Sequence, residues 1–446
     1  MRRRLIGLLA LALLAAACTA GGGVDDSTTA ASIDPNAQHD PLTLTVWSNF
    51  SGREFDVTTG VLQSIKQKYP WMTIKHVGGK DDAAILRAIN GGTPPDMAIS
   101  FTPANSARYC KTGAMQDLNP YLANDKVDKA AMWPPAIFSY TQFENVQCVL
   151  PMLTDAYGLY FNKALLAKAG ITEPPKTLSE LTTAAEKLTE YNADGSIKVA
   201  GYMPLLGFYS GNTVNVYGRG YDAKWYDQSG QPSLATDPSW AKMLQWQKSF
   251  VDSIGYDKLQ KFAAKLGGGD SEWSAAHGFE QGKIAMMIDG EWRTAFIAAD
   301  KSKVDYATAP PPTADDRTDL YGSGQVGGTI IGIPKGVKHA AESWLLVKYM
   351  STDSGALTKL SDGLRNVPST NDALASSELA SDPHFKTFMD IFKHPKSTYK
   401  TLTPIGQVDE DLFGTFGQKW QAGKVPDLQS GLEQLDTQIA KQLQLG

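Results

Sequence analysis

Aromatic and polar residues follow the ends of three apolar segments of the chain. They are Trp47, Ser48 and Asn49; Ser100, Phe101 and Thr102; and Asp289 and Trp292. In open α/β sheets ligands bind beyond the carboxyl ends of the strands, so these residues can meet at one site. Aromatic rings stack on C–H faces, while amide, hydroxyl and carboxylate groups pair with hydroxyls. The pattern predicts a site for a hydroxyl-rich ligand, with core packing as the alternative for Trp47 and Trp292.

Further candidates lie in glycine-containing segments and near Asn49. Residues 207–226 carry an aromatic group that can stack on a ligand or pack an irregular loop: Phe208, Tyr209, Tyr221 and Trp225. Gly327 and Gly328 can let the chain bend or approach a ligand closely. Arg365 can reach the site, although a surface salt bridge is the commoner fate of an arginine. Arg53 and Glu54 are alternatives to Asn49 as polar contacts.

Several other kinds of site find no support in the sequence. The six histidines show no i, i+4 pairing and no cysteine partner, so no metal site and no cofactor are predicted. A formal net charge of −5 gives no basic field for nucleic acid. The sequence also lacks a Gly-x-Ser-x-Gly nucleophile turn. We therefore expect a binding protein without catalytic residues.

The elements that hold these residues alternate between strand and helix. Strand patterns over 42–50, 71–77 and 97–101 enclose helical patterns over 55–69 and 81–90, which is the βαβ order of a parallel sheet. A second α/β region follows Pro151. It is predicted to contain strands at 157–161 and 304–312 and helices at 178–191, 239–252, 340–350 and 412–443, the last broken at Pro426. A chain of this length predicts two lobes.

The start of the chain predicts export. Three arginines at positions 2–4 precede an apolar run over residues 5–17, which is shorter than the ~20 residues of a membrane-spanning helix and typical of a signal peptide over residues 1–17. The run leads into Cys18, and the junction resembles the lipobox of bacterial lipoproteins, in which the cysteine is lipidated. An ordinary cleaved signal is the alternative. Residues 18–40 then form the lipidated cysteine and a flexible tether.

Two cysteines remain when Cys18 is assigned to the lipid. In an oxidising compartment Cys110 and Cys148 are expected to pair as a disulfide. Two buried free thiols are the alternative, because the sequence gives no geometry for the pair.

Six segments occur in a characteristic order along the chain. They are residues 44–49, 92–96, 151–163, 279–292, 327–335 and 365–369. The most distinctive ends in Gly290-Glu291-Trp292. Together they resemble extracellular solute-binding protein family 1, the sugar-binding lipoproteins of ABC importers that are similar to maltose-binding protein. The resemblance extends over essentially all of residues 41–446.

The resemblance implies an α/β fold of the periplasmic-binding-protein-like kind, with two α/β lobes joined by a multi-strand hinge around a ligand cleft. Lobe 1 would comprise residues 41–151 plus about 306–337, and lobe 2 residues 152–305 plus about 338–446. The lobes would close around the ligand. The family's Gly-x-Trp places Trp292 against the sugar, and an acid at the position of Asp155 accepts hydroxyl hydrogens. A solvated hinge acid is the alternative for Asp155.

The implied function is capture of a sugar or oligosaccharide by a monomer that is held outside the cytoplasmic membrane by its lipid. Its partners would be ABC permease subunits with a cytoplasmic ATPase. The first alternative is binding of a non-sugar polyol or a glycerophosphodiester, for which Arg53, Arg219 and Arg365 are the candidate basic residues. The second is a secreted glycoside hydrolase, in which two carboxylates such as Asp155 and Glu291 converge on the scissile bond.

Overall fold

The strands of the computed structural model, which describes residue 30 and residues 32–445, form one large sheet and a hairpin. Their bounds are β1 (Leu42–Trp47), β2 (Met72–Val77), β3 (Met97–Ser100), β4 (Leu150–Asn162), β5 (Glu190–Tyr191), β6 (Ile197–Val199), β7 (Met286–Gly290), β8 (Tyr306–Ala309), β9 (Val326–Gly332) and β10 (Val367–Pro368). The large sheet has the order β10-β4-β9-β3-β1-β2, and β7 and β8 also pair with β4.

The parallel part of the sheet positions two of the candidate strand ends. β1 lies between β2 and β3 and is parallel to both. Leu44 and Val46 of β1 are fully buried, and all four positions of β3 are buried, as expected for a central strand covered on both faces. Because β1 and β3 are parallel neighbours, the residues after Trp47 and those after Ser100 lie at the same edge of the sheet.

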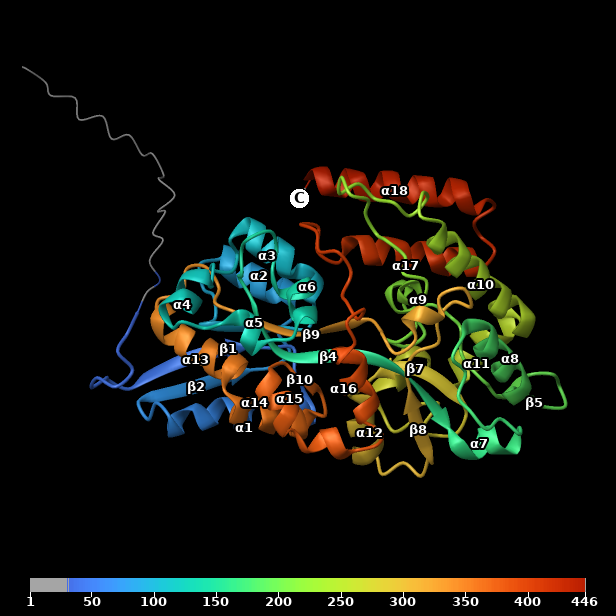
Figure 1. Ribbon diagram of the computed structural model, residues 1–446, viewed down its shortest axis with the longest axis horizontal. Coiled ribbons are helices and arrows are strands. Elements are labelled where there is room, and N and C mark those ends of the chain that lie inside the picture. Colours follow the sequence, from blue (N-terminus) through green and yellow to red (C-terminus); the bar gives the residue numbers. More distant parts are fainter. Residues whose placement is uncertain (1–29, 31, 446) are drawn as a thin grey trace, which may run out of the picture.

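Strand β4 belongs to both lobes of the molecule. Its first half, up to Ala156, pairs antiparallel with β9 and, at Leu153 and Thr154, with β10. Its second half, from Tyr157, pairs with β7 and β8. Figure 1 shows the result: β1 and β2 lie in one body, β7 and β8 in the other, and β4 runs between them. The fold is therefore two α/β lobes joined by strands.

Helices cover the sheet in both lobes. Their bounds are α1 (Gly52–Gln63), α2 (Asp82–Asn90), α3 (Ser106–Thr112), α4 (Asn119–Asn124), α5 (Lys129–Met132), α6 (Phe138–Thr141), α7 (Lys163–Lys168), α8 (Leu178–Leu188), α9 (Val214–Gly220), α10 (Pro238–Ile254), α11 (Tyr256–Lys265), α12 (Arg293–Ala299), α13 (Ala340–Thr352), α14 (Ser354–Leu364), α15 (Asn371–Ser376), α16 (Lys386–Lys393), α17 (Val408–Gln421) and α18 (Leu428–Leu445). A short 3-10 helix, η4 (Gly268–Trp273), precedes β7.

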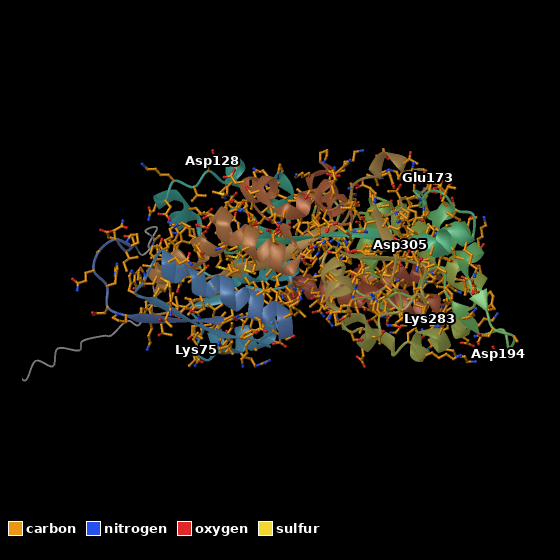
Figure 2. The ribbon with its side chains drawn as sticks, turned by 90° about the horizontal axis from the view of Figure 1, so that it is seen from below. Lys75, Asp128, Glu173, Asp194, Lys283 and Asp305 are labelled. Atoms are coloured by element: carbon orange, nitrogen blue, oxygen red, sulfur yellow. A yellow bond between two sulfur atoms is a disulfide. The ribbon has the colours of Figure 1, made fainter. Side chains whose placement is uncertain are left out.

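Burial follows the chemistry of the side chains. In the second lobe Trp225, Trp240 and Phe413 pack edge to face with ring centroids 4.8–5.5 Å apart. The charged residues Lys75, Asp194 and Lys283, which are labelled in Figure 2, are exposed on the outside of the lobes. Within the described part of the chain, no helix combines the length and apolar character needed to cross a membrane.

Most of the elements expected from the sequence are confirmed, including the first β-α-β-α-β order and the break at Pro426 between α17 and α18. The helix expected over 178–191 ends earlier, at Leu188. Glu190 and Tyr191 instead form β5, which pairs with β6 across the turn at residues 192–195. Turn formation there outweighs the helical periodicity of the preceding residues.

Two segments lie in the other lobe from the one expected. β8, within the 306–337 segment assigned to lobe 1, pairs with Leu159–Asn162 of β4 beside β7. α13 and α14, assigned to lobe 2, pack against β3, β9 and α1 of the first lobe. The apolar stripe of a helix or strand shows that it is buried but does not specify the partner, so the sequence could not place these elements.

Cys110 and Cys148 form a disulfide with their Cα atoms 5.2 Å apart, as expected. Cys110 lies in α3 and Cys148 lies just before β4, so the bond ties the α3–α6 region to the start of the strand that both lobes share. Cys18 and the leader fall outside the described residues.

Replacing both cysteines by serine is expected to lower the free energy of unfolding by about 4 kcal/mol. The disulfide closes a loop with a sequence separation of 38 residues, and removing it restores conformational entropy to the unfolded chain. Denaturant unfolding of the wild type and the double variant measures this difference. Reductant should shift the midpoint of the wild type and leave that of the variant in place; equal midpoints under oxidising conditions would contradict the expectation.

Candidate functional site

A cavity of about 650 Å³ lies at the edge of the sheet where β1 and β3 end, and residues of both lobes line it. Its lining is Asn49, Phe50, Ser51, Gly52, Arg53, Glu54, Phe101, Asp155, Tyr157, Ser210, Trp273, Trp292, Phe296, Thr329 and Asn366. The first lobe supplies the residues after β1 and β3, and the second supplies those around η4 and α12. Aromatic, amide, hydroxyl and carboxyl side chains all face this space.

The first wall of the cavity follows from the parallel pairing of β1 and β3. Phe101, just beyond β3, is 40% exposed and packs edge-on against Phe50 with the ring centroids 4.5 Å apart. Asn49, the residue before Phe50, is exposed, and Ser51 is the residue before α1. An exposed phenyl ring beside an exposed amide gives this wall both an apolar plane and a hydrogen-bonding group.

The second wall is built around Trp292. Its indole folds back over Gly290, where a Cβ atom would lie only 2.2 Å from the six-membered ring. Any larger residue at position 290 would displace the indole, which explains why glycine precedes this tryptophan by two. Tyr157 packs edge to face on Trp292 at 5.5 Å, and Trp273, which is 52% exposed, lies 6.5 Å from it. These rings form a continuous aromatic platform.

A buried cluster of charged residues, Arg293, Asp289 and Glu280, packs against the aromatic platform. The Arg293 guanidinium donates through Nε to Asp289 at 2.8 Å and through Nη1 to Glu280 at 3.4 Å. The same guanidinium lies 5.5 Å from the Trp273 ring centre and 5.2 Å from that of Phe296, within the range of cation–π attraction. Burial raises the pKa of Glu280 to about 7, and Arg293 opposes that rise. The cluster fixes the position of both rings.

Arg53 connects the two walls. Its Nη1 donates to the carbonyl of Gly363 at 2.6 Å in the first lobe, while its guanidinium carbon lies 5.9 Å from the Phe296 ring of the second lobe. The other terminal nitrogen, Nη2, is buried without a hydrogen-bond partner among the described residues, as is Nε1 of Trp292. Burial raises the pKa of the neighbouring Glu54, with Arg53 opposing and Asp155 adding to the rise. Two side chains that line the cavity thus each have an N–H donor without a partner among the described residues.

Two carboxyl groups meet at the base of the cavity. The Asn366 side chain donates from Nδ2 to Asp155 at 2.9 Å and to Glu291 at 2.8 Å, and the Ala156 N–H donates to Glu291 at 2.9 Å. The two carboxyl groups are therefore neighbours that share one amide donor. Burial raises the pKa of Asp155 to about 6, although the hydrogen bonds from Glu291 and Asn366 oppose it. Burial and the charge of Asp155 hold the pKa of Glu291 well above its usual range.

A model of the bacterial extracellular solute-binding protein family matches residues 71–357, which is more than half of the chain. The chain belongs to this family. Among relatives, this solute-binding protein is 21% identical over 407 residues to the maltotriose-binding protein of Pyrococcus abyssi, covering 90% of this chain and 82% of the relative. It is 24% identical over 377 residues to the diacetylchitobiose-binding protein DasA of Streptomyces coelicolor, covering 82% of each.

Solved structures show the same fold. The protein CpMnBP1 with mannotriose bound superposes with a TM-score of 0.77 at 24% identity, covering 89% of this chain and 99% of that structure. The two-lobed architecture derived above from the sharing of β4 is therefore that of known sugar-bound proteins, and the family is extracellular.

Four of the residues predicted from sequence line the cavity together: Asn49, Phe101, Asp155 and Trp292. Arg53 and Glu54, the alternatives to Asn49, also line it. Two further predicted residues flank the lining without forming part of it. Ser48 is buried and shares a 2.8 Å hydrogen bond with His76, and Trp47 lies under the Lys80 ammonium at 4.9 Å.

Other predicted residues support the walls from outside the cavity lining. The hydroxyl of Ser100 accepts the Thr102 N–H at 3.0 Å and so shapes the turn after β3. Asp289 is buried in the ion pair with Arg293. Gly327 and Gly328 lie in β9, and at Gly328, whose φ is +150°, a Cβ would come within 2.3 Å of the Leu153 carbonyl. The close approach of β9 to β4 at the crossing requires that glycine.

The remaining predicted residues are not brought to this cavity. Phe208 and Tyr209 stack on each other at 4.0 Å, and Tyr209 stacks on the buried His277 at 4.5 Å. Tyr221 and Trp225 are buried in the second lobe. Arg365 bonds Asp382 and donates to Thr294 at 2.8 Å. In the structure, Phe208, Tyr209, Tyr221 and Trp225 pack against other side chains and Arg365 forms an ion pair, which were the alternatives to ligand binding.

Several lining residues were missed, and some had a usable signal. Tyr157 follows Asp155 by two on one strand, so both side chains are on the same face. Phe296 follows Trp292 by four at the start of α12, which places both on one side of a helix. Asn366 adjoins the predicted Arg365. Trp273 had no signal, because η4 has no periodicity that would predict its direction.

Asp155→Asn is expected to remove a pH dependence of stability. A carboxyl whose pKa is raised on folding contributes stability that is fully present below about pH 4 and is lost as pH rises through about 6. The melting temperature of the wild type, relative to the variant, should therefore fall between pH 4 and pH 6.5 and then level off. Thermal unfolding across that range measures it. Asp257→Asn, at an exposed site, is the control and should give a flat difference; a flat difference for Asp155→Asn would contradict the expectation.

Proposed function

We propose that this solute-binding protein captures a sugar or oligosaccharide and delivers it to an ABC importer. The observation that carries the proposal is the cavity in which aromatic faces from two lobes, Phe101 on one side and Trp292 and Trp273 on the other, enclose a space edged by amide, hydroxyl and carboxyl groups. A pyranose presents C–H faces to such rings and hydroxyls to such groups, so both kinds of surface are satisfied at once.

The relatives support this choice of ligand class. Two of them are binding proteins for maltotriose and for diacetylchitobiose, and a solved structure of the same fold holds mannotriose. All three ligands are oligosaccharides. They differ in monomer and linkage, so they support the class of ligand rather than one sugar.

An anionic ligand such as a glycerophosphodiester finds less support. Among the described residues that line the cavity, Arg53 is the one cationic side chain, and Asp155 and Glu54 are acidic. Arg219 and Arg365, the other candidates, form ion pairs with Asp222 and Asp382 outside the lining. A phosphate would meet more carboxyl groups than guanidinium groups there, and that juxtaposition is unfavourable.

The same carboxyl groups favour binding over glycoside hydrolysis. Hydrolases of the common type hold their two carboxyls roughly 5–10 Å apart on either side of the scissile bond. Instead, one Asn366 amide donates to both Asp155 and Glu291, and Glu291 is 0% exposed. A sugar cannot lie between these two groups, so the pair lacks the arrangement of a hydrolase and we propose binding without catalysis.

Anchoring outside the membrane completes the proposal. Cys18 would carry the lipid, residues 19–40 would tether the folded body, and the ligand-bound form would dock on permease subunits that are driven by a cytoplasmic ATPase. Closure of two lobes around a ligand is an established way to distinguish loaded from empty states. The protein would work as a monomer, because the described lobes enclose the cavity by themselves.

Trp292→Ala is expected to weaken sugar binding about tenfold or more. The indole provides buried apolar area and a stacking face, and together these are worth at least ~1.4 kcal/mol. A thermal-shift screen of wild-type protein against mono- and oligosaccharides first identifies a ligand, because any compound that binds the native state alone raises its melting temperature. Calorimetry with that sugar then compares the variants.

Tyr191→Ala is the matched control for this experiment. Tyr191 is 47% exposed, similar to Trp273 and Phe101, but it lies on β5 away from the cavity. Its loss should leave the affinity unchanged. Unaltered binding by a folded Trp292→Ala variant would remove Trp292 from the site, and turnover of a glycoside by the wild type would refute the proposal.

Cys18→Ser is expected to release the protein from the membrane. Loss of the acylated thiol leaves the body without a lipid, and the folded part offers no substitute span within its described residues. Fractionation of cells that express each form measures the membrane-bound share. A Cys18→Ser protein that stays with the membrane would count against lipidation at this residue.

A further inference from the structure

Glu291 is a buried acid whose hydrogen bonds all lead to the base of the cavity. It lies between Gly290, the last residue of β7, and Trp292, and its side chain is 0% exposed. One carboxyl oxygen accepts the Ala156 N–H at 2.9 Å and the other accepts the Asn366 amide at 2.8 Å. The Asp155 carboxyl lies beside it, because the same Asn366 amide donates to Asp155 at 2.9 Å. Glu291 itself is outside the cavity lining, whereas Asp155 and Asn366 belong to it.

The three side chains come from three different segments that meet at the junction of the lobes. Asp155 lies on β4 where that strand leaves the first lobe, Glu291 follows β7 of the second lobe, and Asn366 precedes β10. The single Asn366 amide donates to both carboxyl groups. Two carboxyls that share one donor in a buried site repel each other strongly if both are ionised, so they retain one proton between them.

The geometry places that proton on Glu291. Glu291 has no exposure, whereas Asp155 is partly exposed to the cavity and can keep its charge there. A protonated Glu291 can donate to the Asp155 carboxylate while still accepting from Ala156 and Asn366. Asp155 then receives hydrogen bonds from Glu291 and Asn366 and has lone pairs left for a ligand.

We propose that Glu291 is a positioning residue: as a neutral acid it donates its proton to Asp155 and, with Asn366, holds that carboxylate toward the cavity as the acceptor for ligand hydroxyls. This inference rests on the proposed sugar-binding function. The proposed role requires that Glu291 be protonated. A buried side chain that only fills space would not require a proton.

The surrounding titratable groups set the pH range in which this arrangement holds. Glu54 of α1, Tyr140 of α6 and Tyr157 of β4 interact electrostatically with the pair, and Arg53 lies beside Glu54. Glu272 of η4 and the Asp289–Arg293 ion pair lie beyond Tyr157 in the second lobe. Arg53 opposes the rise in the pKa of Glu54, and burial keeps the pKa of both tyrosines well above the ordinary value. The pKa of Glu54, which also lines the cavity, is raised as well, so variants of Glu291 and Asp155 are needed to assign a pH effect to the pair.

The affinity for a sugar should accordingly have two pH limbs. Below about pH 6 Asp155 takes up a proton and becomes a weaker acceptor, so the affinity falls. At a higher pH than this, Glu291 loses its proton and two like charges face each other, so the affinity falls again. Glu291→Gln keeps a hydrogen-bond donor toward Asp155 but cannot ionise. It should retain the acid limb and lose the alkaline one.

The test measures affinity by calorimetry from pH 5 to pH 10 with maltotriose, mannotriose and diacetylchitobiose as probes. The wild type, Glu291→Gln, Glu291→Leu and Asp155→Asn are compared, with Tyr191→Ala as the control and with thermal unfolding to show that each variant is folded. At pH 7 we expect Glu291→Gln to bind within about threefold of the wild type, whereas Glu291→Leu and Asp155→Asn lose about tenfold or more, the range expected for a hydrogen bond to a charged group.

A second measurement, made without ligand, tests the protonation of Glu291 directly. It depends neither on finding a sugar that binds nor on the folding of the Glu291→Leu variant. The infrared difference spectrum between wild type and Glu291→Gln at pH 7.5 should contain a protonated carboxyl band. Its absence, or an alkaline limb that persists in Glu291→Gln, would overturn the positioning role. Failure of the wild type to bind any probe or any sugar in the wider screen would overturn the proposed function instead.

Discussion

The sharing of one strand between two lobes is the constraint on which the rest of the structure depends. The backbone of β4 is committed to β9 and β10 in its first half and to β7 and β8 in its second, so neither lobe has a complete sheet without it. The change of partners falls at residues 156 and 157. Asp155 and Tyr157, on either side of this change, both line the cavity. The cavity therefore lies where the strand passes from one lobe to the other.

The two walls of the cavity are held by different physical means. On the first wall, hydrogen-bonded parallel strands fix the ends of β1 and β3, and the side chains beyond them have some freedom. On the second wall, a tryptophan is folded over a glycine and two further rings lie on a buried guanidinium. Isolated ion pairs in a protein interior contribute little net stability, because desolvation opposes their attraction. The main effect of the Arg293–Asp289 ion pair is therefore to fix the positions of the aromatic rings that contact the guanidinium.

The sequence predicted the parts of this arrangement that depend on local patterns. The first three strands, the helices between them and the break at Pro426 follow from periodicity and chain-breaking residues, and Asn49, Phe101 and Trp292 followed from their positions after strands. The sequence could not predict to which lobe α13 and α14 belong, because an amphipathic pattern shows that a helix is buried on one side but does not specify what it packs against. Trp273 and Asn366 were missed for a related reason: they reach the cavity through irregular or very short elements. Burial also decided between alternatives for Trp225 and Tyr221, whose large rings suit a core as well as a ligand.

The late position of β9 in the chain has a consequence for the order in which the protein can form. Ala98 of β3 pairs with Gly332 of β9, so the sheet of the first lobe is completed only after the strands of the second lobe have been made. If the chain emerges from its N-terminal end during export, the edge of β3 that later pairs with β9 is unpaired until β9 has emerged. Unpaired strand edges are prone to aggregate. The bond between Cys110 and Cys148 joins residues that both emerge well before β9. It can therefore restrain the α3–α6 region against the start of β4 before β9 is available to pair with β3.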